Sequence, residues 1–171
     1  MSELTQSTTH RRPWWIILFR IAFTSITVGV IFFIFFNSAQ VAEVSGVKSQ
    51  QVTKIINEVL DKCNVEISLT EHIVRKLAHL SEYCLLGFWL MLTVHVYTKR
   101  LFVFSSWPML GGLIVALSDE FFQSFIPGRS SQVRDVFIDF VGVCTGVVAA
   151  AILLFCVMLL CSIVKFIFKK R

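Results

Sequence analysis

The amino-acid sequence predicts an all-α fold: a polytopic transmembrane helical bundle of about four spans, with an extracytoplasmic amphipathic helical segment. The composition departs strongly from that of soluble proteins, since 56% of the 171 residues are hydrophobic and the mean hydropathy is +0.75. The apolar residues are also gathered into long runs, each able to cross a hydrocarbon core of about 30 Å. A chain of this length predicts a single membrane domain over residues 1–171.

The first predicted span covers about residues 14–36. Trp14 and Trp15 begin it and are typical of the aromatic belt at a membrane interface. Arg20, the one charge in the run, lies about one turn deeper, so that its long side chain can reach back to the head groups. A cleaved signal peptide is the alternative. It is disfavoured because the apolar run is longer than a normal signal core and no small-x-small cleavage site follows.

A long polar loop is predicted over residues 37–75, and its acidic and basic side chains nearly cancel. Val52, Ile55 and Val59 recur at helical spacing, which predicts an amphipathic helix at 40–62 on the membrane surface or against the other helices. Ser68-Leu-Thr-Glu71 has the form of a capping box. The second long helix is therefore expected to begin there, ahead of its entry into lipid.

The second span is predicted at about 77–97 and the third at about 101–125, with Lys99-Arg100 as a short turn between them. Pro108 and Gly111-Gly112 predict a kink in the third span, because proline and glycine weaken a helix interior.

The fourth span is predicted at about 136–164, after a turn at Ile126-Pro127-Gly128-Arg129. Gly142, Gly146 and Ala150 repeat every four residues along it. Such a stripe of small residues predicts the close approach of a neighbouring helix.

The basic residues predict the orientation of the bundle. They flank the apolar runs in short groups: Arg11-Arg12, Lys99-Arg100, and the 165–171 tail. The positive-inside rule places all three groups in the cytoplasm, and with them both termini. The same distribution argues against nucleic acid as a partner, because it is a topology signal rather than a basic binding face.

This orientation brings the polar ends of several helices to one outer face. An ionisable group at the centre of a membrane helix costs about 2.5–3.5 kcal/mol, so such groups tend to persist where they pair, face water or act. Asp119 is predicted to point away from the cluster and to be exposed, because it is turned by about 100° from Glu120. The predicted ligand-binding residues are Lys76, Glu82, Tyr83, Gln123, Arg129, Asp135 and Asp139, and the candidate catalytic residues are His79 and Glu120.

Spacing along the helices refines this cluster. Lys76, His79 and Tyr83 share one helix stripe. Asp135 and Asp139 are four residues apart and would repel each other if both were ionised. Pairing with Arg129 or Lys76 would relieve that repulsion, and a bidentate arginine–carboxylate pair is the preferred geometry.

Simpler interpretations stand beside each of these assignments. His79 alone is equally well an interfacial histidine bonded to a carbonyl group. Glu120 and Gln123 are read alternatively as a polar helix cap, and Arg129 with Asp135 as a structural loop clasp. Tyr83 is read alternatively as an interface aromatic.

No metal or other cofactor is predicted. A metal held by His79, Glu82 and Glu120 is a weaker alternative, and the five cysteines lack metal-ligand spacing. The sequence contains no HExxH motif, no glycine-flanked serine nucleophile and no glycine-rich phosphate loop, so no reaction type is selected.

Three blocks in order resemble the VanZ-like family of bacterial membrane proteins. The blocks are Arg75 through Gly87, Asp119 through Arg129, and Asp135 through Asp139 with Gly142, and the resemblance extends over roughly residues 14–160. It implies a small multi-pass protein of the bacterial cytoplasmic membrane, in a family whose named member is associated with low-level resistance to the glycopeptide teicoplanin. Asp139-Phe140 departs from the family pattern, in which an asparagine is expected near this helix start.

Three classes of function follow. The first is a nonenzymatic membrane protein that affects glycopeptide susceptibility or envelope homeostasis by binding a lipid, peptidoglycan-precursor or glycopeptide ligand at the outer leaflet. The second is an enzyme that modifies such a head group by acid–base chemistry at His79 and Glu120. The third, a transporter, is disfavoured because four short spans show no internal repeat. The oligomeric state is not predicted.

Overall fold

The computed structural model describes residues 13–40, 42–64, 68–98, 100–127 and 132–169, and within these ranges every regular element is a helix. The helices are α1 (Trp14–Ser38), α2 (Ala42–Lys62), α3 (Glu71–Tyr97), α4 (Leu101–Phe104), α5 (Ser106–Gln123) and α6 (Val133–Lys169). The predicted all-α class is confirmed.

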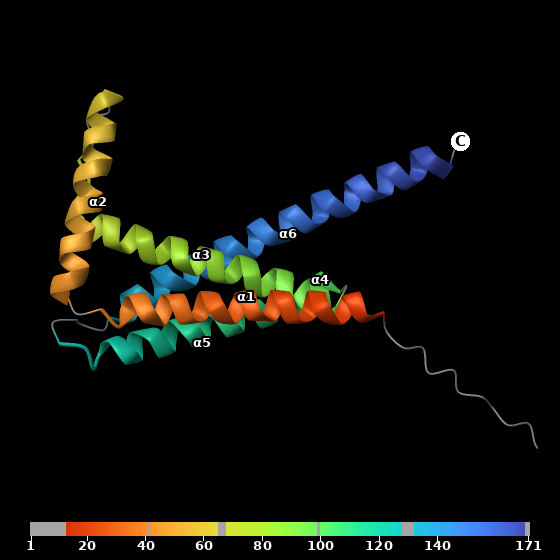
Figure 1. The fold of residues 1–171 in the computed structure, drawn as a ribbon, viewed down its shortest axis with the longest axis horizontal. Coiled ribbons are helices and arrows are strands. Elements are labelled where there is room, and N and C mark those ends of the chain that lie inside the picture. The colour runs from red at the N-terminus through yellow and green to blue at the C-terminus, as the bar shows by residue number, and fades with distance from the viewer. Residues whose placement is uncertain (1–12, 41, 65–67, 99, 128–131, 170–171) are drawn as a thin grey trace, which may run out of the picture.

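Helices α1, α3, α5 and the first half of α6 form the bundle (Figure 1). Helix α3 is central, since it packs against α1, α2, α5 and α6. The apolar core lies between these helices and consists of Ile34, Tyr83, Leu86, Met91, Ala116, Val143, Val147 and Ala150. The outward faces are largely apolar and exposed, which is the surface expected against lipid tails.

The closest helix pair is α3 with α6, and glycines allow that approach. A methyl group added to Gly142 would lie 2.6 Å from the carbonyl oxygen of Leu80 on α3. A methyl group on Gly146 would overlap the carbonyl oxygen of Cys84, and one on Gly87 would overlap that of Val143. The predicted small-residue stripe on the last span therefore does provide a helix-packing face.

Three of the described helices are long and apolar enough to cross a membrane: α1, α3 and α6. Helix α5 is shorter, at 18 residues, and ends in the polar residues Asp119, Glu120 and Gln123. It packs against α1, α3 and α6, so the bundle agrees with about four spans. The apolar helices identify a membrane protein in a lipid bilayer.

The predicted third span differs from the structure at its start. The helix is interrupted at Ser105, between the end of α4 at Phe104 and the start of α5 at Ser106. Helix α5 then continues without interruption through Pro108, Gly111 and Gly112. Pro108 is tolerated because it stands in the first turn of α5, where its missing N–H has no helical partner to lose.

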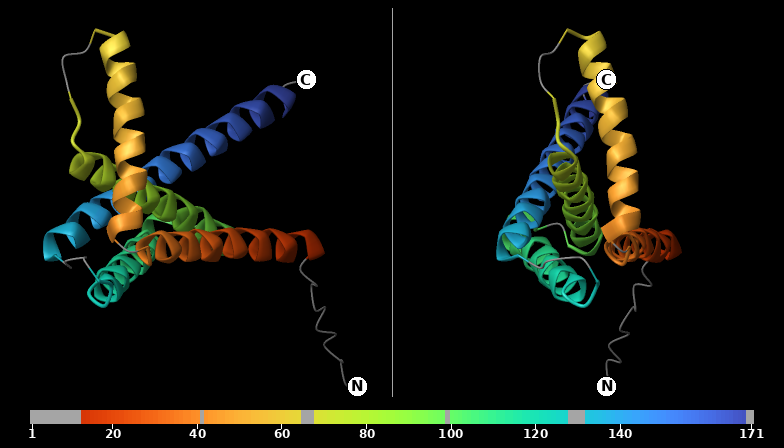
Figure 2. Two further views of the ribbon diagram at one scale, coloured as in Figure 1. Left: turned by 60° about the vertical axis from the view of Figure 1, so that its left-hand side comes forward. Right: turned by 90° about the vertical axis from the view of Figure 1, so that its left-hand side faces the viewer.

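Helix α2 confirms the predicted amphipathic segment at 40–62. It stands across the bundle at the end where α1 finishes and α3 begins, rather than alongside the spans (Figures 1 and 2). This is the orientation expected of a helix that lies along a membrane surface. Its apolar Val52, Ile55 and Val59 are exposed in the structure.

The start of α3 corrects one sequence prediction. The N-cap is Thr70, whose hydroxyl accepts a hydrogen bond from the backbone of Ile73 at 3.4 Å, so the predicted Ser68 cap is wrong. Residue Leu69 is instead held by Asn57 of α2, which accepts from its N–H at 2.9 Å and donates to its carbonyl at 3.1 Å. These two hydrogen bonds to Asn57 hold Leu69 outside the helix, so α3 begins only at Glu71.

Candidate functional site

Four helix ends meet at one end of the bundle. Helices α1 and α5 finish there, and α3 and α6 begin there (Figure 1). The polar residues of each helix are concentrated in that terminal stretch, so the alternating direction of the helices collects them into one site. The predicted convergence of the clusters is thus reproduced by the fold.

Asp119 lies at the centre of this site and is fully buried. Its Oδ2 accepts hydrogen bonds from Ser38 Oγ at 2.8 Å, from Tyr83 OH at 3.2 Å and from Gln123 Nε2 at 3.0 Å. The donors belong to α1, α3 and α5, so one carboxylate oxygen joins three helices. A carboxylate removed from water requires such donors to offset its desolvation.

The prediction that Asp119 is exposed is wrong. Asp119 and Glu120 are both buried, with exposed fractions of 0% and 6%, although they are 100° apart around α5. At this end α5 is packed against α1, α3 and α6 together, so more than one of its faces is covered. The angle between two residues around a helix does not show how many neighbouring helices cover that helix.

Tyr83 and Gln123 belong to the same buried network. Tyr83 has no exposed surface, which excludes its alternative reading as an interface aromatic. Gln123 follows Asp119 by one helical turn and also donates to Ser38 at 3.3 Å. Both were predicted as ligand-binding residues, and the structure shows them bonded to Asp119.

Other polar contacts surround this network. Asn37 of α1 donates from Nδ2 to Glu82 Oε1 at 2.7 Å. Glu120 Oε2 accepts from the backbone N–H of Gln132 at 3.1 Å, which ties α5 to the approach to α6.

The predicted relief of repulsion between Asp135 and Asp139 by Lys76 agrees with the structure. Lys76 Nζ and Asp135 Oδ1 form an ion pair at 2.6 Å, with side-chain exposures of 26% and 31%. Arg129, the other predicted partner, lies outside the described residues, so the bidentate pair remains a prediction.

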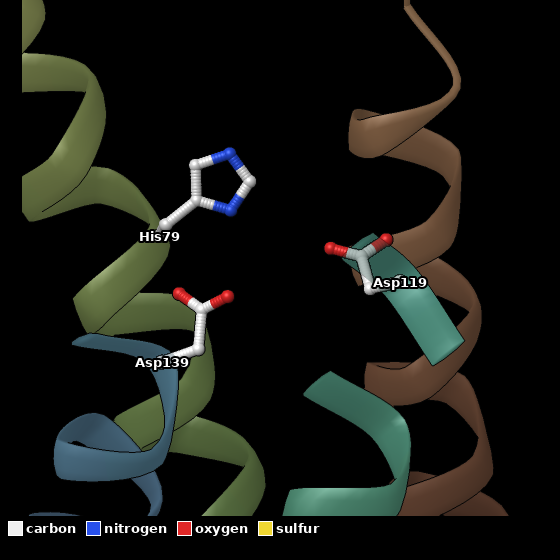
Figure 3. Close-up of side chains that lie close together, drawn as sticks. All are labelled: His79, Asp119 and Asp139. Atoms are coloured by element: carbon white, nitrogen blue, oxygen red, sulfur yellow. The ribbon is translucent and has the colours of Figure 1, made fainter. Parts of the chain in front are cut away.

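A second group is formed by His79, Asp119 and Asp139, from α3, α5 and α6 (Figure 3). Each offers one ligand atom, and these atoms all lie within 4.8 Å of one another. Asp139 is 2% exposed and His79 is half-buried. The sequence paired His79 with Glu120 as candidate catalytic residues, and the fold adds Asp119 and Asp139 to the surroundings of His79.

Sequence reasoning missed Asp119, Ser38 and Asn37 as site residues. Asn37-Ser38 stands at the C-terminal end of an apolar helix, where two polar residues in succession are a usable signal. The sequence by itself does not connect these two residues to the other clusters, because no spacing rule links the end of α1 to α5.

The comparison with protein families bears on this same region. A family model described as VanZ/LLP1 matches residues 23–168. The chain belongs to the VanZ/LLP1 family. The match covers the described polar residues of the site on all four helices, and it confirms the resemblance seen in the sequence. No match was found among curated proteins or among solved structures.

The residues that meet at this end of the bundle define what the site can do chemically. It contains three buried side chains that hold a carboxylate through hydrogen bonds, and a half-buried histidine that faces two buried aspartates. Its rim carries an ion pair with partly exposed charges. Such a set suits the binding of a polar or charged group, proton transfer by an imidazole, or coordination of a cation.

Proposed function

We propose that this VanZ/LLP1 protein resides in the bacterial cytoplasmic membrane and binds the polar head group of an envelope lipid or lipid-linked precursor at the outer leaflet. Through this binding it contributes to glycopeptide susceptibility or to envelope homeostasis. The supporting observation is the convergence of buried polar side chains from α1, α3, α5 and α6 at one end of a bundle whose surface is apolar. Both termini are proposed to lie in the cytoplasm, which puts this end at the outer face.

The rim of the site supports a charged head group as the ligand. Lys76 is partly exposed beside Asp135, and Arg134 is exposed one residue earlier on α6. Cations of this kind bind phosphate oxygens, and the neighbouring carboxylates suit an ammonium group. Helix α2 lies across this end of the bundle, so a ligand in the adjacent leaflet would meet both elements (Figure 2).

An enzyme acting on such a head group is the second candidate. The observation that favours it is His79, which faces Asp119 and Asp139 in Figure 3. A histidine beside carboxylates is a common acid–base arrangement. In this version His79 is the candidate acid–base group, with the buried aspartates or the predicted Glu120 as its partner.

The first experiment measures teicoplanin susceptibility in cells with and without the protein. Cells carrying His79→Ala or Gln123→Ala at wild-type protein level are expected to have the same teicoplanin susceptibility as cells that lack the protein. His72→Ala is the control, because His72 is an exposed histidine on the same helix. Full function in both site variants at normal protein level would contradict the proposed site.

Lipid and peptidoglycan-precursor profiling of the same cells separates the two candidates. If the protein is an enzyme, the profile should differ between cells with and without it. Cells carrying His79→Ala should then show the profile of cells that lack the protein. A binding protein predicts a susceptibility difference with an unchanged profile. Loss of the protein in the variants, rather than loss of the phenotype alone, would indicate a structural clasp.

A further inference from the structure

His79, Asp119 and Asp139 form a set that neither the sequence prediction nor the family match assigns to a metal ion. The three side chains come from three different helices and are directed toward a shared space (Figure 3). One nitrogen or oxygen atom from each lies within 4.8 Å of the others. Around a Zn²⁺ ion, ligand atoms stand about 2.0–2.2 Å from the metal, so modest side-chain rotations would bring all three into coordination.

Asp119 supplies an independent observation. Its side chain is fully buried, and Oδ2 already accepts three hydrogen bonds. The other oxygen, Oδ1, is buried and has no hydrogen-bond partner among the described residues. Oδ2 accepts from Ser38 of α1, and Figure 3 shows one oxygen of the Asp119 carboxylate turned toward His79 and Asp139. A buried carboxylate oxygen without a donor is costly, and a cation would satisfy it.

The local charge favours a cation as well. Asp119 and Asp139 are buried carboxylates close to each other, and two like charges at short range repel strongly in a nonpolar environment. Lys76, the nearest lysine in sequence to His79, is engaged with Asp135. A divalent ion between the two aspartates would neutralise both at once.

The donor set indicates which cation fits. An imidazole nitrogen with two carboxylate oxygens suits a first-row transition ion, whereas Mg²⁺ and Ca²⁺ prefer oxygen donors throughout. Three protein ligands leave a coordination position open. The donors to Oδ2 of Asp119 resemble the outer hydrogen bonds that orient metal-binding carboxylates.

We infer that His79, Asp119 and Asp139 bind one divalent transition-metal ion, such as Zn²⁺ or Mn²⁺, at the junction of α3, α5 and α6. The inference goes beyond the proposed function and does not depend on it, because it concerns the metal alone. Ser38, Tyr83 and Gln123 act as positioning residues that fix the carboxylate of Asp119.

The test uses the purified full-length protein in detergent, stripped with EDTA and titrated calorimetrically with ZnCl₂, MnCl₂ or MgCl₂. About one Zn²⁺ or Mn²⁺ per chain is expected, with weaker binding of Mg²⁺. His79→Ala and Asp139→Asn are each expected to weaken binding at least about 10-fold. The control His72→Ala is expected to bind like the wild type.

A spectroscopic readout accompanies the titration, because Co²⁺ bound by nitrogen and oxygen ligands absorbs visible light. The Co²⁺ protein is expected to show this absorption, and His79→Ala to lose it while retaining its helical circular dichroism. Folded wild-type protein that binds no transition metal would overturn the inference, as would binding that survives in both His79→Ala and Asp139→Asn. Neither result would affect the susceptibility measurements in cells, so the two proposals fail separately.

Discussion

At the scale of single residues, Asp119 organises the polar end of the bundle. Its Oδ2 receives donors from Ser38, Tyr83 and Gln123, and all four residues are buried. Hydrogen bonds to a charged group in a water-poor environment contribute more than exposed ones, because water does not replace a lost partner. Removing one donor should therefore affect stability measurably.

Tyr83→Phe tests this expectation, since it removes the hydroxyl and keeps the ring. We expect it to destabilise the protein by about 1.5–3 kcal/mol, the usual range for a hydrogen bond to a charged acceptor. The measurement is the unfolding transition in detergent. Tyr97→Phe is the matched control, because the Tyr97 hydroxyl shares an exposed hydrogen bond with Thr24 at 3.1 Å. Equal effects in both variants would mean that the Asp119 network adds no special stability.

At the scale of helices, the contact of α3 with α6 depends on glycine. The backbone of Gly146 lies against the carbonyl group of Cys84, and that of Gly142 against the carbonyl group of Leu80. In a membrane, helix association relies on close packing rather than on the exclusion of water. This contact also places Asp139 of α6 opposite His79 of α3, so the packing of the helices sets the geometry of the site.

Gly146→Ala should consequently separate α3 from α6. We expect a loss of about 1–3 kcal/mol in stability, because the added methyl group overlaps backbone atoms that have little room to move. Gly29→Ala is the matched control on α1, where an added methyl group meets no atom within 4 Å. There the change should stabilise the helix by up to about 1 kcal/mol. Both are measured by thermal unfolding in detergent, and a neutral Gly146→Ala would contradict the packing argument.

At the scale of the whole molecule, direction alternates from α1 to α3, α5 and α6, so the polar site occupies one end of the bundle (Figure 1). Helix α6 has 37 residues and extends beyond the other helices. At 1.5 Å per residue it is about 55 Å long, which exceeds the hydrocarbon core and requires a tilt or an extension beyond the bilayer.

Cysteine accessibility tests the proposed topology. In a variant whose only cysteine is the exposed native Cys63, we expect a membrane-impermeant maleimide to react in intact protoplasts. In a variant whose only cysteine comes from Lys169→Cys, at the end of α6, labelling should require an opened membrane. The reverse pattern would move the polar site to the cytoplasmic leaflet and remove the basis for an outer-leaflet ligand.

Sequence patterns were most reliable where one element decides the outcome. The apolar runs predicted α1, α3 and α6, and helical spacing predicted α2, because hydropathy and periodicity act within a segment. The stripe at Gly142 and Gly146 indicated a packing face, although not its partner. The N-cap of α3 was misplaced because Asn57, on another helix, holds Leu69 in the structure.

For the site, sequence alone determined the membrane class, the family and the gathering of polar residues at one end, since these follow from composition, ordered motifs and alternating helix direction. Only the tertiary structure decided which polar groups meet. It buried Asp119 beneath Ser38, Tyr83 and Gln123, and it set His79 against Asp139. The physical reason is that such contacts depend on how far helices rotate and how closely they pack, and both are set by glycine contacts between helices distant in sequence.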